Sequence, residues 1–340
     1  MKRVLSAVLA VLMLVTLVAL SGCGAKAEPL KFGMGIEAVY GDSKNADGET
    51  QGTTEVEVTA AAVLLDADGK IVKAVIDTAQ NKATYTAEGK AVANTEFKTK
   101  GEKGAAYGMA TYGQDLNGDG VVKEWNEQIA IFASAVEGKT IDEVKAMVVK
   151  GYGNEEIQTA GCTMAVADYA KALEKAVANA AESDATAEDA LQLGFITTEE
   201  AKDTTDEKDG SSEMETTITA AVVNKDGKVV VAKTDVLAAT IAFDAKGVVT
   251  TDLTAALQTK IEKGANYGMA AYGQDLNGDG VVKEWNEQGA AFDAALAGKT
   301  ATEIAALEVK GYGVESVQTA GCTIAISDMV KAAVKAATVA

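Results

Sequence analysis

The chain has 340 residues, and 48% of them are hydrophobic, so it can bury real cores and global disorder is excluded. Its formal net charge of −19 repels phosphate backbones, and we expect no nucleic acid partner. It contains no histidine, which excludes Ser-His and Cys-His catalysis within this chain.

Residues 1–22 have the pattern of a secretory signal peptide. Lys2 and Arg3 precede an apolar run that ends at Leu20, and two small residues separate this run from Cys23. Leu20-Ser-Gly-Cys23 resembles the bacterial lipobox, which implies that Cys23 is lipidated and anchors the protein on the extracytoplasmic face of the cell membrane. Residues 23–29 then form a tether. The alternative is an ordinary signal peptide with an incidental cysteine.

The mature chain repeats itself at an offset of 160 residues. The block Tyr107–Gln128 returns as Tyr267–Gln288 with one difference, and the block Gln158–Thr163 returns as Gln318–Thr323 with none. A period this long indicates tandem domains, since solenoid repeats run roughly 20–50 residues.

The repeat predicts two copies of one small domain. We place domain 1 at 30–180 and domain 2 at 187–340, and the polar, acidic segment 181–189 is expected to be a linker or the end of a helix.

Strands are expected early in each domain. Thr54–Thr59 alternates like a half-buried strand, Val63–Leu65 continues it, and Asp66–Gly69 has turn chemistry before a returning strand at Ile71–Ile76. The equivalent hairpin of domain 2 is Ile218–Val223, Lys225–Gly227 and Val229–Lys233.

Helices are expected later in each domain. Trp125, Ile129, Phe132, Ala133 and Val136 share one helical face, which ends at Gly138-Lys139. Thr140–Glu143 is typical of a capping box, and Val166, Tyr169, Ala170, Leu173 and Val177 have helical spacing. Strands followed by helices predict an α+β fold with an antiparallel hairpin or sheet in each domain.

The first repeated block contains the opening of a calcium-binding loop. Oxygen-bearing side chains at positions 1, 3 and 5 precede a glycine at position 6, as in an EF-hand, but position 12 is Asn126 instead of glutamate. The candidate Ca²⁺ ligands are Asp115, Asn117 and Asp119, with Asp275, Asn277 and Asp279 in domain 2. The alternative is a polar turn that begins the following helix.

The second repeated block is a glycine-containing turn before a helix. Gly161 permits close approach to the backbone, and the helix N-terminus after it favours an anion such as phosphate. Lys150 supplies a positive charge and Tyr152 a ring for stacking. An ordinary turn into a helix is the more common meaning of this pattern alone.

The order of these features looks like the FMN-binding domain of membrane and cell-surface flavoproteins. Asp47-Gly48 precedes a hairpin with Asp-Gly-Lys at its turn, Tyr107-Gly-Met109 stands where that family has a Gly-rich segment, and Gln128 through Lys139 resembles its Gln-then-Gly-Lys stretch. The family closes with Ser-Gly-Ala-Thr, and the matching residues here are Ala160–Thr163 and Ala320–Thr323.

The resemblance covers most of each domain and implies a covalently bound cofactor. The family's threonine hydroxyl is joined to the FMN phosphate by a separate flavin transferase, which implies FMN on Thr163 and Thr323, a redox partner and extracellular electron transfer. The candidate cofactor-binding residues around them are Gly161, Cys162, Tyr152 and Lys150, with Gly321, Cys322, Tyr312 and Lys310 in domain 2.

Two departures from the family motif keep a second prediction open. Serine has become Ala160 and alanine has become Cys162, and domain 2 shows the same changes. The alternative is a non-enzymatic surface binding or structural lipoprotein that keeps the fold without flavin and is stabilised by calcium. Either protein is an electron carrier or a binding protein instead of a hydrolytic enzyme, and the two cysteines are expected to be small buried thiols.

Overall fold

The computed structural model describes residues 28–338 except 95, 114, 116, 117, 119, 273, 274, 276, 277 and 279. The predicted signal peptide and Cys23 lie outside the described residues, as do Asn117, Asp119, Asn277 and Asp279. Within the described ranges, no helix has the length and apolar character that crossing a bilayer requires.

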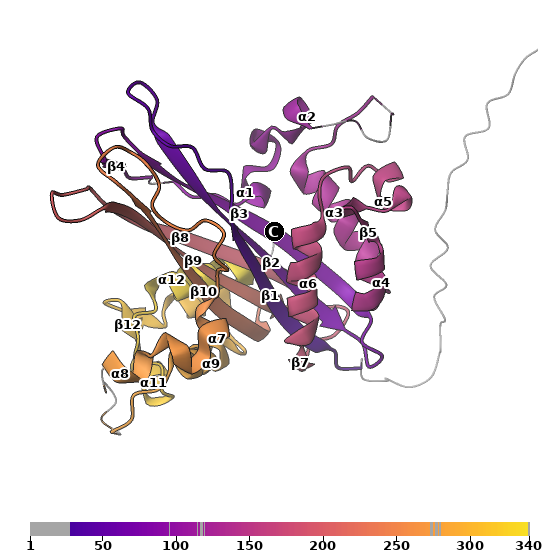
Figure 1. Ribbon diagram of the computed structural model, residues 1–340. Coiled ribbons are helices and arrows are strands. Elements are labelled where there is room, and N and C mark those ends of the chain that lie inside the picture. The colour runs from indigo at the N-terminus through magenta and orange to yellow at the C-terminus, as the bar shows by residue number, and fades with distance from the viewer. Residues whose placement is uncertain are drawn as a thin grey trace, which may run out of the picture.

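Helices and antiparallel sheets make up the described chain, which confirms the predicted α+β class (Figure 1). One sheet has the strand order β4-β3-β2-β1-β7 and the other has the order β10-β9-β8. The strands of the first sheet are β1 (Lys31–Tyr40), β2 (Gly52–Leu65), β3 (Ile71–Tyr85), β4 (Ala91–Val92) and β7 (Ala181–Glu182). Those of the second are β8 (Ala190–Lys202), β9 (Gly210–Val223) and β10 (Val229–Phe243).

Short and long helices follow the main strands in each half of the chain. In the first half they are α1 (Lys100–Lys103), the 3₁₀ helix η1 (Gly104–Tyr107), α2 (Met109–Tyr112), α3 (Trp125–Val136), α4 (Ile141–Ala146), α5 (Glu155–Thr159) and α6 (Ala167–Ala178), with a small hairpin of β5 (Val148–Val149) and β6 (Tyr152–Gly153). In the second half they are α7 (Lys260–Lys263), η2 (Gly264–Tyr267), α8 (Met269–Tyr272), α9 (Trp285–Leu296), α10 (Ala301–Ala305), α11 (Glu315–Thr319) and α12 (Ser327–Ala337), with β11 (Glu308–Val309) and β12 (Tyr312–Gly313).

The predicted hairpins and helices are confirmed. The turn at Asp66–Gly69 joins β2 to β3, and the Asp66 carboxylate accepts the amide of Lys70 at 2.8 Å. The expected helical face became α3, with Trp125 and Phe132 buried. Thr140 forms the predicted capping box at the start of α4.

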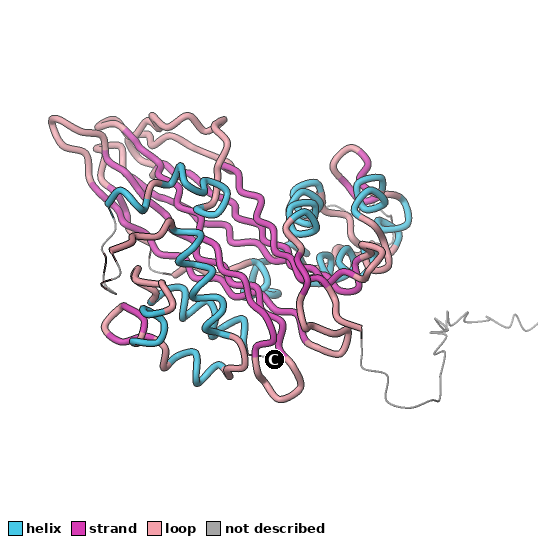
Figure 2. Tube along the Cα trace, turned by 90° about the horizontal axis from the view of Figure 1, so that it is seen from below, coloured by secondary structure: helices cyan, strands magenta, loops and turns pink. Residues whose placement is uncertain are grey.

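The two main sheets pack face to face, with helices on the outside. One apolar cluster joins inward side chains of both sheets, such as Met34 and Val58 of the first and Ile218 and Leu237 of the second. Two further clusters lie between each sheet and its own helices. Figure 2 shows the strands between two groups of helices. The order of layers is therefore helix, sheet, sheet, helix.

This arrangement corrects the prediction of a half-buried strand at Thr54–Thr59. Val56 and Val58 face the other sheet, whereas Ala61 and Val63 further along β2 face the helices. Most of β2 is consequently buried on both faces. An alternating sequence cannot distinguish a face that meets solvent from one that meets a second sheet.

Strand β1 was not predicted, because glycines replace apolar residues on one of its faces. A Cβ added to Gly33 or Gly35 would collide with backbone atoms of Ala176 in α6. Gly194 of β8 has the same relation to Ala332 of α12. The central helix of each half thus packs at backbone contact on a strand, which only glycine permits.

The acidic segment 181–189 is a packed part of the molecule. It contains β7, which pairs with β1, and the carbonyl of the buried Ala185 accepts the amide of Leu30 at 2.8 Å. Helix α6 ends before it, at Ala178. The segment is therefore neither a free linker nor the end of a helix.

Direct contacts also join the two halves away from this segment. The Asn81 side chain donates to the Thr216 hydroxyl at 2.9 Å in the buried space between the sheets. At the far end of the strands, the rings of Tyr85 and Phe243 stack with centroids 4.5 Å apart and an interplanar angle of 9°. The halves therefore form one folded unit with a common core.

Candidate functional site

The predicted threonine turn is the C-terminal cap of helix α5. The amide of Gly161 donates to the Gln158 carbonyl at 2.9 Å, and that of Cys162 donates to the Ile157 carbonyl at 3.1 Å. This pair of bonds, with φ of 103° at Gly161, is a Schellman motif. The motif explains both the glycine and the small apolar residue after it, because Cys162 packs in the same core cluster as Ile157.

Thr163 is held in place by the side chain of Gln128 from α3. The Gln128 Oε1 atom accepts the amides of Thr163 at 2.8 Å and Met164 at 3.0 Å. Its Nε2 group donates to the carbonyl of Lys123 at 2.8 Å and contacts Met109 Sδ at 3.3 Å. Gln128 is 1% exposed, so this bridge is protected from water. It fixes the threonine turn against the start of α3.

The second half has the same arrangement. Gln288 Oε1 accepts the amide of Thr323 at 2.8 Å and its hydroxyl at 3.1 Å. Its Nε2 group donates to the carbonyl of Lys283 at 2.9 Å. The hydroxyl of Thr163 lies 3.5 Å from Gln128 Oε1, a longer contact. Thr163 is buried, with 8% of its surface exposed, and Thr323 is half-buried.

A lysine that the sequence analysis did not single out lies against each glycine of this turn. A Cβ added to Gly161 would come within 2.6 Å of Lys123 Nζ, and one added to Gly321 would collide with Lys283 Nζ. Lys283 also donates to the carbonyl of Ala320 at 3.4 Å. Both lysines lie inside the first repeated block, and that recurrence was the available signal.

These residues fit a phosphate ester better than a free phosphate ion. The Thr163 and Met164 amides, which a free phosphate would use, are already bound to Gln128. The Thr163 Oγ lies 3.5 Å from Gln128 Oε1, farther than the two amides that Gln128 binds, so a bond at Oγ would leave those two amide bonds in place. The ammonium group beside Gly161 supplies an opposite charge for a phosphate there.

The cysteines of the motif are structural, as predicted. Cys162 and Cys322 are free, buried thiols, and burial raises the pKa of each to about 12. The thiolate that nucleophilic chemistry requires is therefore scarce at neutral pH. Both side chains belong to the apolar clusters beneath the turn, and their selection as cofactor-binding residues stays a prediction.

Lys150 and Tyr152 lie on the small hairpin of β5 and β6. Lys150 occupies the turn with a positive φ of 52° and is exposed, and Lys310 has φ of 53° at the equivalent position. Tyr152 is 40% exposed and pairs through its backbone with Ala165, two residues after the threonine. Tyr312 pairs in the same way with Ala325. A backbone bridge therefore holds each tyrosine next to the threonine turn. Lys150 and Lys310 occupy the exposed turns of their hairpins and make no such bridge among the described residues.

The carboxylates at position 1 of the candidate calcium loops close a turn. The two oxygens of Asp115 accept the amides of Gly118 at 2.7 Å and Gly120 at 2.9 Å. Asp275 makes the same two bonds at the same distances in the second half. Within the described ranges, no three acidic or cysteine side chains gather as metal ligands. These bonds are those of the polar turn that was the alternative interpretation.

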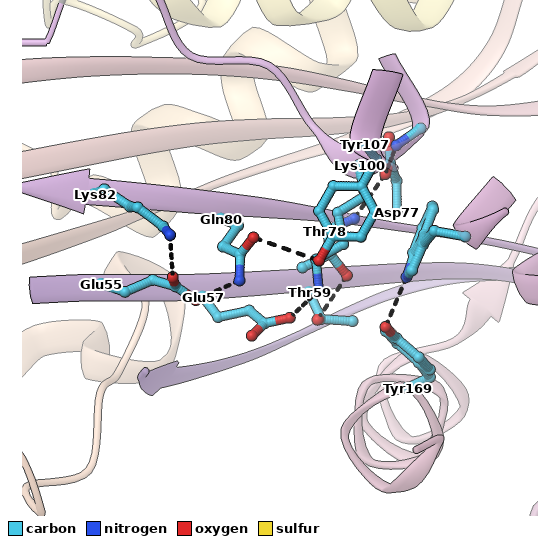
Figure 3. A network of polar contacts seen from close by, with 12 residues as sticks. Glu55, Glu57, Thr59, Asp77, Thr78, Gln80, Lys82, Lys100, Tyr107 and Tyr169 are labelled. Atoms are coloured by element: carbon cyan, nitrogen blue, oxygen red, sulfur yellow. Dashed lines mark hydrogen bonds and ion pairs between the residues drawn. The ribbon is translucent and has the colours of Figure 1, made fainter. Parts of the chain in front are cut away.

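A buried lysine and glutamate pair beneath a tyrosine was missed by the sequence analysis. Lys100 is 6% exposed, lies 2.5 Å from Glu57 Oε1, and has its ammonium 5.5 Å from the ring centroid of Tyr107 (Figure 3). Burial lowers the pKa of Lys100, but Tyr169 and Glu57 outweigh it and hold this pKa above its usual value.

The second half repeats this pair. Lys260 lies 2.9 Å from Glu215 and 5.4 Å from the ring centroid of Tyr267. Both lysines follow a threonine that caps a short helix, in Thr-Lys-x-Glu-Lys-Gly-Ala-x-Tyr sequences that begin at Thr99 and Thr259. The repeated block therefore starts eight residues before Tyr107, and extending the comparison upstream would have found the pair.

The chain has no match among protein-family models, curated proteins or solved structures.

Proposed function

We propose that the chain is a lipid-anchored, extracytoplasmic electron carrier in which two copies of an FMN-binding domain each hold FMN through a threonine, Thr163 or Thr323. The anchor is Cys23. When bound, FMN supplies the redox chemistry, and the chain supplies attachment, orientation and charge. A flavin transferase makes the attachment, and a separate redox partner exchanges electrons with the flavin.

The observation that carries the proposal is the recurrence of one arrangement in both halves. Each threonine follows a glycine at positive φ, and a buried glutamine binds its amide at 2.8 Å. A lysine ammonium lies against each of these glycines. A structural turn accounts for the glycine and the glutamine, and the lysine also lies near the last carbonyls of the helix, as Lys283 does at Ala320. A phosphate on the threonine oxygen would use that cation.

The two sites face opposite sides of the molecule. Thr163 follows α5 in the helical layer outside the first sheet, and Thr323 follows α11 in the layer outside the second. Figure 1 shows these two helices on opposite sides of the sheets. The sheets between them are about 10 Å apart, and each helical layer adds a similar thickness. The two flavins therefore do not touch, and each exchanges electrons with partners on its own side of the protein.

The mass of the intact protein tests the proposal. The full chain is produced with a flavin transferase, and we expect two additions, each equal to FMN less one water. Thr163→Ala should remove one addition, and Thr163→Ala with Thr323→Ala should remove both along with the yellow colour. Thr159→Ala, at the exposed end of α5, is the matched control and should keep both. Unmodified mass in the native chain would reject the proposal.

A flavin-free binding or structural lipoprotein is the second candidate, and a specific observation favours it. The Schellman motif accounts for Gly161 and Cys162 by packing alone, without any cofactor. The shared core between the sheets makes a rigid body suited to display on a membrane surface. Unmodified protein from the native host, with full thermal stability in the absence of flavin, would favour this candidate.

A further inference from the structure

A cavity of about 610 Å³ opens over the outer face of the first sheet, away from the threonine turn. Gln80 and Lys82 of β3 form its floor, and Lys98, Lys103, Tyr107 and Tyr112 line its sides. Tyr107 donates to Gln80 Oε1 at 3.4 Å, and Gln80 in turn donates to Glu55 at 2.6 Å (Figure 3). The floor of the cavity is thus a fixed polar network.

Three lysines give this cavity a positive charge in a strongly acidic chain. Lys82 lies 3.5 Å from the carboxylate of Glu55, which Gln80 also binds beneath the lining, and Glu96 is the one acid among the lining residues. Burial lowers the pKa of Lys103, and the charges of Lys82 and Lys100 lower it further. A lysine whose protonation is opposed by its neighbours marks a place where an anion is favoured.

Two tyrosines add aromatic surface to the same cavity. The ring centroids of Tyr107 and Tyr112 lie 6.1 Å apart in an edge-on arrangement, and Tyr112 is 60% exposed. The ammonium of Lys103 lies 5.8 Å from the Tyr107 centroid. An exposed tyrosine face beside positive charge suits a ligand that is both planar and negative.

The second half keeps Lys263 and Tyr267 at the positions of Lys103 and Tyr107, but it lacks the other two lysines and the glutamine of this cavity. Lys82 stands opposite Glu55 in the β2–β3 register, and Thr240 stands opposite Glu213 in the β9–β10 register. Ala238 likewise replaces Gln80, and the repeat offset of 160 residues places Gln258 where the first half has Lys98. Two of the three lining lysines, Lys82 and Lys98, are therefore specific to the first half.

We infer that this cavity binds one planar aromatic anion per chain. The lysines hold the carboxylate or sulfonate group of the ligand, and its ring stacks on Tyr112. The lining includes none of the residues of the threonine turn, so the Thr163→Ala variant tests whether binding here depends on flavin attachment.

Titration calorimetry with anthraquinone-2-sulfonate tests the inference on the full chain in a mild detergent, with empty detergent as the blank. We expect one site per chain and binding that weakens as salt is added, since the attraction is partly ionic. The test variant combines Gln80→Ala, Lys82→Thr and Lys98→Gln. It carries the residues that the second half already accommodates in the same fold, and we expect its affinity to fall at least tenfold.

The matched control places two lysines at exposed positions of α9 and α10 that match no residue of the cavity, as Ala294→Lys with Thr302→Lys. If nonspecific charge attraction caused the binding, the triple variant with these two lysines would regain the lost affinity. Native-strength binding by the triple variant, two equal sites in the native chain, or equal binding of neutral anthraquinone would each overturn the inference. Circular dichroism of the triple variant confirms that it is folded.

Discussion

Asp293 is a buried acid in α9, and its removal should stabilise the protein at neutral pH. It is 8% exposed, and neither carboxyl oxygen makes a hydrogen bond of good geometry with a described residue, although contacts with the side chain and amide of Thr234 favour its ionised form. Burial raises the pKa of Asp293 to about 7, although the charge of Lys233 opposes the rise. Asp235, also buried, has its pKa raised to about 6 by burial and raises that of Asp293 further.

The shift in pKa sets the sign and size of the effect. An ordinary aspartate has a pKa of 3.8, so the unfolded chain releases this proton at lower pH than the folded chain does. The stability contributed by protonated Asp293 is fully present below pH 3.8 and is lost as the pH rises through about 7. Three pKa units correspond to about 4 kcal/mol in the free energy of unfolding.

The substitution Asp293→Ala introduces the residue that the first half has at the matching position, Ala133 of α3. We expect the free energy of unfolding at about pH 8 to rise by up to about 4 kcal/mol, and the change at about pH 4 to be much smaller. Urea denaturation followed by circular dichroism measures both values. Glu156→Ala, which removes an exposed acid, is the control and should leave the pH profile unchanged.

Two results would refute this reasoning. One is an Asp293→Ala protein that is less stable than the native chain at about pH 8, which would mean that the ionised carboxylate has stabilising partners. The other is an unchanged dependence of stability on pH. Because Asp235 titrates in nearly the same range, the double variant with Asp235→Asn separates the two contributions.

Three further predictions concern packing and polar contacts. Gly35→Ala should lower the free energy of unfolding by at least about 2 kcal/mol, because the added Cβ would collide with the α6 backbone. Gly48→Ala is the control, because it has open space around it and should be nearly neutral in the same denaturation assay. Asp115→Ala should cost about 0.5–1.5 kcal/mol in EDTA, because two exposed backbone amides exchange the carboxylate for water. A loss of stability seen only with calcium would show instead that the carboxylate serves a cation. Lys100→Met should cost about 3–5 kcal/mol, since Glu57 loses the partner of a largely buried pair, and adding Glu57→Leu should restore part of it in a double-mutant cycle.

Local patterns in the sequence were sufficient for the hairpins and the main helices. The Asp66–Gly69 turn, the apolar face that begins at Trp125 and the Thr140 capping box each depend on residues within a few positions of one another. The spacing of hydrophobic residues and the chemistry of turns and caps act over that range, so these elements were predictable without knowledge of their surroundings.

The site depends on contacts that no local pattern contains. Gln128 and Thr163 are 35 residues apart and meet only because α3 and the end of α5 pack together. Lys123, which lies beside Gly161, belongs to the segment just before α3. Exact repetition of a block marks such residues as important to both halves, but it does not say which of them touch.

The amino-acid sequence by itself determined the α+β class, the repeated blocks and the turn that carries each threonine. Only the tertiary structure decided that Gly33 and Gly35 belong to a strand, that β2 is buried on both faces, and that two sheets share one core. The physical reason is that burial depends on what packs against a surface. An alternating strand exposes the same two faces whether water, a helix or a second sheet lies against them.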